Sequence, residues 1–202
     1  MFQSGRIPAW IKWAWLAWLL IWVPIYWQGP GPINFLWFCD IANFLIGLAL
    51  WTESSLLLSS QAVGVFLLQC AWSVDYLGRL LLGFHPIGGT EYMFDPSEWI
   101  AVRILSTFHL VVPVVLLWAL SRLRYDRLGV WLQTAFAALI LPASWLAGSE
   151  LNLNWTWRPF GQDQVWLQPE IFLILCLPLA FCVLYWPSHK LFGWWFPAAT
   201  VA

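Results

Sequence analysis

Apolar residues follow one another along most of the chain in long blocks, and short polar breaks separate the blocks. A block of about 20 apolar residues can cross a bilayer as an α-helix. The turn-forming stretches Gly29-Pro30-Gly31-Pro32 and Glu53-Ser54-Ser55 end the first and second blocks. The pattern predicts six transmembrane spans at about residues 9–27, 33–52, 56–78, 98–120, 128–148 and 169–187.

The connections between these spans are mostly short, so consecutive spans are expected to be antiparallel neighbours. Two connections are longer, at about 79–97 and 149–168. The final stretch HKLFGWWFPAATVA is too short to span again and is expected to lie in the membrane interface. The basic start with its apolar run resembles a signal peptide, but residues 9–27 are long, rich in Trp and lack a small-residue cleavage site. We therefore interpret them as a retained helix.

Composition supports the same fold class. Hydrophobic residues make up 61% of the 202-residue chain and charged residues 9%, whereas soluble domains have about 25% charged residues. We expect an all-α, polytopic membrane bundle of about six helices that forms one transmembrane domain over residues 1–202. The 19 tryptophans suit a protein with many membrane–water boundaries.

Charge and cysteine content exclude several classes of partner. The net charge of −1 gives no indication of nucleic-acid binding, and we expect none. All four cysteines lie in apolar segments, so no disulfide framework is indicated. No spacing of ligand residues predicts a metal site, and we expect no cofactor.

The distribution of Lys and Arg predicts the orientation. Six spans place both termini on one side of the membrane. Lys and Arg accumulate in cytoplasmic segments, so we expect cytoplasmic termini, longer loops outside with Gly88 and Gln162, and a location in the bacterial inner membrane. The basic residues expected inside are Arg6, Lys12, Arg122, Arg124, Arg127 and Lys190, against Arg158 and Arg79 outside.

Polar side chains interrupt the apolar spans on one side. All are expected in the outer half of the membrane, whereas the inner half of each span is almost wholly apolar. An ionisable group in lipid costs several kcal/mol unless it is paired or faces water. The pattern therefore predicts one polar cavity, open outward and lined by spans two, three and four. The residues are Cys39, Asp40, Asn43, Asp75, Arg79, Arg103, His109, Asn152 and Asn154.

Two ion pairs would explain part of this set without any function. Asp75 precedes Arg79 by four residues, the better orientation for a helical ion pair. Asp40 has Arg103 as its candidate partner across the bundle. Both pairs would then be structural clamps.

The uncharged members of the set have structural interpretations too. His109 is compatible with a buried histidine bonded to a backbone carbonyl, and Cys39 with a small buried hydrophobe. Asn152 and Asn154 are typical of turn-forming loops.

Four motifs carry a family resemblance. FLWFCDIANF, WSVDYLGRLL, STFHLVVP and NLNWTW occur in this order along most of the chain. In this order the chain resembles uncharacterised multi-pass bacterial proteins that are described only as membrane-associated. The resemblance implies a membrane bundle and no particular activity.

A more distant resemblance concerns catalysis. A Cys-Asp-Ile in an early helix, a later helix with His and an Asn-rich loop are similar to androgen-induced membrane hydrolases and to multi-pass ether-lipid acyltransferases. Those families use a Thr or Cys nucleophile and a His on another helix. The resemblance implies hydrolysis or transfer of a lipid acyl group, with Cys39 and His109 in these roles.

The residues themselves allow this chemistry. A thiol needs an adjacent base to become a good nucleophile, and His109 is the candidate base for Cys39. Asp40 is the candidate to orient the imidazole, and Asn43 to donate to the oxyanion. The expected substrate-binding residues are Asn43, Asp75, Arg79, Arg103, Asn152 and Asn154, with an Arg on a carboxylate or phosphate headgroup.

A second class of function stays open. The small size and many tryptophans also suit a non-catalytic subunit, or a lipid- or pigment-binding partner, of a larger membrane complex. A transporter is less favoured, because neither internal repeats nor broken mid-membrane helices are evident. The expected partners are membrane lipids and subunits of such a complex.

Overall fold

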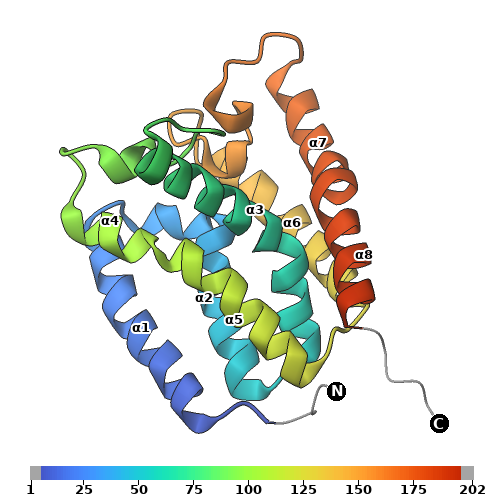
Figure 1. The fold of residues 1–202 in the computed structure, drawn as a ribbon. Coiled ribbons are helices and arrows are strands. Elements are labelled where there is room, and N and C mark those ends of the chain that lie inside the picture. Colours follow the sequence, from blue (N-terminus) through green and yellow to red (C-terminus); the bar gives the residue numbers. More distant parts are fainter. Residues whose placement is uncertain (1–5, 197–202) are drawn as a thin grey trace.

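The computed structural model describes residues 6–196, and within that range the regular secondary structure is entirely helical. The α-helices are α1 (Ala9–Gln28), α2 (Phe38–Thr52), α3 (Ser55–Leu82), α4 (Ile100–Ser106), α5 (Phe108–Leu123), α6 (Gly129–Leu146), α7 (Pro169–Ala180) and α8 (Trp186–Trp195). Short 3-10 segments are η1 (Pro32–Leu36), η2 (Glu91–Phe94), η3 (Leu153–Trp155) and η4 (Pro159–Gly161), and η5 (Phe181–Tyr185) is a π-helical turn. The predicted all-α bundle is confirmed (Figure 1).

Each of the six predicted spans is helical. Five helical stretches within the described range are long and apolar enough to cross a membrane, and two of these join consecutive helices, at Ile100–Leu123 and Pro169–Trp195. The second span is shorter, because η1 takes up its start and leaves 15 residues for α2. An ideal helix of that length rises about 23 Å, which is less than the hydrocarbon core.

The described part of the predicted tail is helical, and its position in the interface stays a prediction. Residues 186–195 continue the last span as α8, so that this helix runs ten residues beyond η5, and the rest of the predicted tail, residues 197–202, lies outside the described range. Pro187 explains the wide turn at η5. Its ring would clash with the carbonyl four residues earlier in a regular α-helix, and a π-turn relieves that clash.

Helix α3 is the centre of the bundle. In its apolar window 56% of the residues are buried, against 11% for the Pro169–Trp195 span. It packs against α2, α5, α6 and α8, whereas α1 and α7 lie at opposite edges (Figure 1). Small residues allow this close packing: a Cβ added at Gly129 of α6 would lie 2.7 Å from Ser59 Cβ and 2.8 Å from the Ser59 carbonyl carbon.

The inner part of the bundle is more polar than the sequence indicated. Ser59, Ser60, Gln61 and Gln133 are buried there. Ser59 Oγ accepts the Asp126 N–H at 2.8 Å, and Gln61 Nε2 donates to Ser60 Oγ at 3.0 Å. The expectation of an almost wholly apolar inner half is therefore wrong. These side chains satisfy each other and the α5–α6 turn at a close helix contact.

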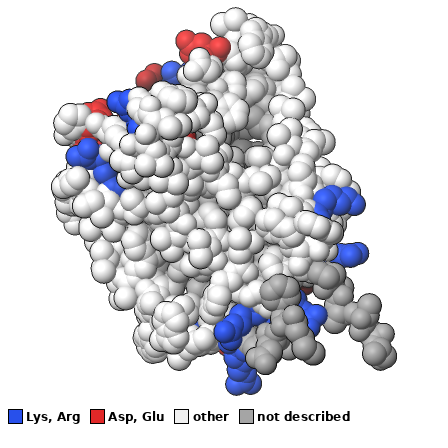
Figure 2. Space-filling model, in the orientation of Figure 1, with Lys and Arg blue, Asp and Glu red and all other residues white. Residues whose placement is uncertain are grey.

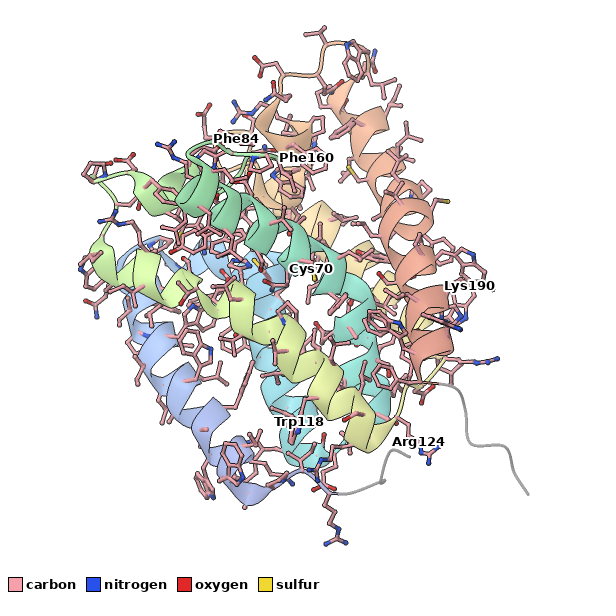
Figure 3. The ribbon with its side chains drawn as sticks, viewed as in Figure 1. Cys70, Phe84, Trp118, Arg124, Phe160 and Lys190 are labelled. Carbon is pink, nitrogen blue, oxygen red and sulfur yellow. The ribbon has the colours of Figure 1, made fainter. Side chains whose placement is uncertain are left out.

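The two ends of the bundle differ in chemistry. Helix α1 begins and α8 ends at the lower end in Figure 1, and the two longer connections lie at the upper end. Figure 2 shows charged side chains gathered toward these ends, with a largely uncharged surface between them. Figure 3 places Phe84 and Phe160 at the loop end, Arg124 at the other end and Cys70 between them. This arrangement fits an integral membrane protein.

Candidate functional site

The first helical turns of α2 bring Asp40 and Asn43 into the protein interior, as predicted. Both side chains are buried, and Cys39 beside them is half-buried. Trp37 precedes α2 in an extended conformation, so the helix starts one residue before the thiol. The interior position spares Asp40 the contact with lipid that a carboxylate avoids.

Asn43 makes its hydrogen bonds to groups within the protein. Its Oδ1 accepts the Trp18 indole N–H at 3.1 Å, and its Nδ2 donates to the Cys39 carbonyl at 3.0 Å. The Trp15 indole donates to the Asn43 carbonyl at 2.9 Å. Asn43 therefore joins α1 to α2, and its side chain is fully buried at that contact.

Asp40 pairs with neutral groups. Asn34 Nδ2 donates to Oδ2 at 2.7 Å, and the Cys39 thiol lies 3.8 Å from Oδ1. The predicted Asp40–Arg103 pair is wrong. Arg103 instead reaches the Met93 carbonyl at 3.4 Å, because it extends along the outer surface of α4 toward η2.

Hydroxyl groups gather near this carboxylate. Tyr26 Oη and Ser106 Oγ lie 2.6 Å apart and join α1 to α4. Burial raises the pKa of Tyr92, although neighbouring Ser106 and Trp72 lower it, and the charges of Cys39 and Asp40 raise it further. The outer ends of α1 and α2, the last residue of α4 and η2 thus contribute to one polar cluster.

His109 belongs to a different set of contacts. Its Nδ1 hydrogen-bonds to Gln69 Oε1 on α3. Its ring is stacked between Trp72 and Phe108, with ring centroids 4.4 and 4.2 Å away. Within the described residues, Cys39 therefore bonds to Asp40 and His109 to Gln69, and the two do not bond to each other. Gln69 was missed in the sequence, although it lies one helical turn before Trp72 on α3.

Asp75 anchors the loop after α3. Its Oδ2 accepts from Thr90 Oγ1 at 2.5 Å and lies 2.9 Å from His85 Nδ1. Its Oδ1 accepts the Ile87 and Gly88 N–H groups at 2.8 and 2.7 Å. The side chain is fully buried.

The predicted Asp75–Arg79 ion pair is wrong. Arg79 is exposed, donates to the Gly83 carbonyl and lies over the Phe94 ring at 5.7 Å. A helical ion pair contributes about 0.2–0.5 kcal/mol, whereas each hydrogen bond to a charged group contributes roughly 1.5–3 kcal/mol. The four hydrogen bonds from the loop to Asp75 therefore contribute more stability than an ion pair with Arg79 would.

The Asn-rich loop has a structural role at α2. Asn154 Oδ1 accepts the Phe38 N–H at 2.9 Å, one of the amide groups at the start of α2 that have no partner within the helix. Its Nδ2 donates to the Leu36 carbonyl and to Ser144 Oγ, both at 2.8 Å. Asn154 thus caps α2 from a loop more than a hundred residues away in the chain.

Asn152 organises the same loop from within. Its Oδ1 accepts the Trp157 and Arg158 N–H groups at 3.1 and 2.9 Å, and its Nδ2 donates to the Arg158 carbonyl at 2.9 Å. Asn152 and Asn154 both have positive φ, at 43° and 51°, a region that asparagine tolerates better than most residues. Both amides therefore have their hydrogen-bonding groups committed to the fold.

Arg103 differs from the other expected substrate-binding residues. It lines an open groove of about 190 Å³ with Tyr76, Met93, Ile100, Ile104 and Thr107. Its Nε is buried and has no hydrogen-bond partner. Of the expected substrate-binding side chains, it is the one with an unused buried donor beside a groove.

The His, Cys, Asp and Glu side chains of the described range suggest neither a metal site nor a disulfide. Within residues 6–196 no group of three or more His, Cys, Asp or Glu side chains is placed to hold a metal ion. The four cysteines are free thiols. Cys39 is the one in contact with a carboxylate.

No family model matches the chain, and no characterised protein or solved structure has significant similarity to it. The family resemblances of the four motifs therefore stay predictions, and inferences about function rest on the geometry above.

Proposed function

We propose that this chain is a non-catalytic membrane component that binds lipid along its helices, as part of a larger membrane assembly. The observation that carries the proposal is that Cys39 and His109 bond to other residues and make no hydrogen bond to each other within the described range. The thiol contacts Asp40, and the imidazole is held by Gln69 between two aromatic rings. A base must approach the proton that it accepts to about 2.6–3.2 Å, so thiol–histidine acyl hydrolysis or transfer is disfavoured.

The other polar candidates support the same conclusion. Asn43 joins two helices, Asp75 anchors a loop and Asn154 caps α2. A substrate that used these groups would have to displace hydrogen bonds within the fold. A buried group left without its partner costs about 1–3 kcal/mol, so such a substrate would bind weakly.

The outer surfaces of the bundle suit contact with lipid or with helices of a partner. Helix α7 has no buried residue, and Ile174, Leu179 and Val183 of the last span are more than half exposed. Helix α1 exposes Trp10 and Trp13 near the terminal end, where amphipathic rings prefer the membrane boundary. These faces are where we place membrane lipid and partner subunits.

We further propose a bacterial inner-membrane location with cytoplasmic termini. The terminal end carries six of the nine Lys and Arg residues, and the loop end carries eight of the ten Asp and Glu residues. This asymmetry is the positive-inside pattern. A cysteine introduced at Gly88 should react with an impermeant thiol reagent in intact cells of a thiol-free variant. Reaction only after the inner face is opened would reverse the orientation.

Lipid retention and thiol labelling test the function together. The wild-type protein, purified in mild detergent, is expected to retain phospholipid in native mass spectra. Cys39 is expected not to form an acyl-enzyme with a fatty-acid p-nitrophenyl ester. The matched control is Cys182→Ser, which removes an exposed thiol.

Two outcomes would contradict the proposal. One is acylation at Cys39 that persists in Cys182→Ser and disappears in His109→Asn. The other is wild-type protein that is folded but free of lipid under conditions that preserve membrane-protein complexes.

A further inference from the structure

The groove beside Arg103 lies at the loop end of the bundle, near the start of the Ile100–Leu123 span. Arg103 is three residues after the start of α4, so it lies roughly 5 Å along the helix from Ile100. Helix α4 begins the Ile100–Leu123 span at the loop end. The guanidinium is therefore near the boundary between the hydrocarbon core and the polar loops.

The guanidinium is poorly satisfied within the protein. It carries five N–H donors, and its one hydrogen bond within the described residues is the 3.4 Å contact from a terminal nitrogen to the Met93 carbonyl. Its Nε–H is buried without an acceptor. The terminal nitrogens keep N–H donors without an acceptor within the described residues, and an external acceptor in the groove would satisfy them.

The charges around the groove leave room for an anion. Asp95 is the acid whose carboxyl group interacts electrostatically with Arg103, and it is exposed in the loop. Hydrogen bonds from Ser97, with a smaller contribution from Arg103, hold the pKa of Asp95 below its ordinary value. The Ser97 N–H and hydroxyl donate to Asp95 Oδ1 at 2.8 and 2.7 Å. The Asp95 carboxylate is therefore bonded outside the groove and does not neutralise Arg103 within it.

The walls of the groove fix the kind of ligand. Ile100 and Ile104 are 55% and 60% exposed, and they continue the groove onto the lipid-facing surface of α4. The volume of about 190 Å³ is smaller than the roughly 300 Å³ at which pockets for whole small molecules begin. It fits a headgroup phosphate and not a complete lipid.

We propose that the groove binds the phosphate of a membrane glycerophospholipid, with Arg103 as its donor and the acyl chain along Ile100 and Ile104. Arginine suits this role because its planar fork donates two parallel hydrogen bonds to phosphate oxygens. The inference rests on the proposed lipid-binding function and gives that function a position and a headgroup chemistry.

The test compares two lipids of equal chain length, phosphatidylglycerol and diacylglycerol, which differ by the phosphoglycerol headgroup that carries the phosphate. Both are added in equal amounts to delipidated full-length protein, and bound lipid is counted by native mass spectrometry. We expect the wild type to prefer phosphatidylglycerol and Arg103→Gln to lose this preference by at least about tenfold. Arg103→Lys keeps the charge and loses the fork, so a loss of about threefold is expected.

Arg79→Gln is the matched control, because Arg79 is an exposed arginine at the same end that bonds to Gly83 and covers Phe94. It should keep the wild-type preference. Inorganic phosphate at the lipid concentration should not displace phosphatidylglycerol, because it lacks the chain along the isoleucines.

The outcomes separate the two proposals. An unchanged preference in folded Arg103→Gln, or in Arg103→Lys where Gln does not fold, overturns the groove assignment while lipid retention by the wild type still supports the proposed function. Displacement by inorganic phosphate overturns the lipid as the occupant. Wild-type protein that retains neither lipid overturns both.

Discussion

The His85 imidazole lies 2.9 Å from the Asp75 carboxylate, and this contact closes the loop after α3 back onto the helix that it leaves. Thr90 and two backbone N–H groups complete the acceptor capacity of Asp75. Gly78 permits the approach, because a Cβ there would lie 2.5 Å from Pro86. Asp75 is thus the point at which the first long loop is fixed.

We predict that Asp75→Asn lowers stability by about 2–4 kcal/mol, since the amide cannot accept all four donors. In detergent the melting temperature should fall by roughly 5–10 °C. In double-mutant cycles, Asp75→Asn should couple to His85→Ala by about 1–2 kcal/mol and be additive with Arg79→Gln. Strong coupling to Arg79 with none to His85 would contradict the contacts of the loop.

This loop marks the limit of what the sequence predicted at the site. Asp75 and Arg79 are neighbours in the helical repeat, so a local rule pairs them. His85 and Thr90 reach Asp75 only because the loop folds back over α3. The sequence spacing of these residues gives no sign of that fold, and the same holds for Gln69 with His109, which meet across α3 and α5.

The helices were more predictable than the contacts. A bilayer imposes a length on any segment that crosses it, so apolar blocks locate the spans to within a few residues in most cases. The largest deviations have local causes. The 3-10 segment Pro32–Leu36 shortens α2, and the π-turn at Phe181–Tyr185 lets the last helix pass Pro187. The burial of Asp40 and Asn43 was predicted because a carboxylate on a lipid-facing surface is unfavourable.

The cap on α2 gives a prediction for the second long loop. Asn154→Ala should lower stability by about 1–2 kcal/mol, because the Phe38 N–H loses its acceptor and alanine is strained at a φ of 51°. Asn154→Gly is the matched variant, since it removes the same side chain and tolerates the backbone. It should be less destabilising than Asn154→Ala. Hydrogen exchange at Phe38 should accelerate in both, and unchanged protection there would exclude the cap.

Because α3 and α6 pack closely at Gly129, we predict that adding one methyl group there is destabilising. Gly129→Ala should lower stability by about 1–3 kcal/mol, although alanine favours helix by about 1 kcal/mol. The added Cβ would lie 2.8 Å from the Ser59 carbonyl carbon and 2.9 Å from the Ser60 nitrogen, and this backbone cannot turn away. Gly193→Ala in α8 is the control, because nothing lies within 4 Å of its added Cβ. Thermal unfolding should show opposite signs for the two changes, and equal signs would argue against a tight α3–α6 contact.

At the terminal end, Lys12 donates to Glu53 at 2.7 Å and ties α1 to the α2–α3 turn. The hydrogen bond from Lys12, helped by the charges of Lys12 and Arg6, lowers the pKa of Glu53 from its ordinary value of 4.5. A carboxyl group with a lower pKa in the folded state contributes stability above its ordinary pKa and loses that contribution as the pH falls through the folded-state pKa. We therefore expect a loss that begins near pH 5 and stays below about 1 kcal/mol, because water screens a partly exposed pair.

Glu53→Gln removes the titrating group and keeps a side chain of similar size at the same positive φ of 55°. Its stability between pH 7 and pH 4 should fall less steeply than that of the wild type, and Lys12→Gln should flatten the curve in the same way. Glu150→Gln, at an exposed acid of the opposite end, should keep the wild-type slope. Melting temperatures measured across this pH range decide the point: if Glu53→Gln and Glu150→Gln follow the same curve, the ion pair does not contribute to the pH dependence of stability.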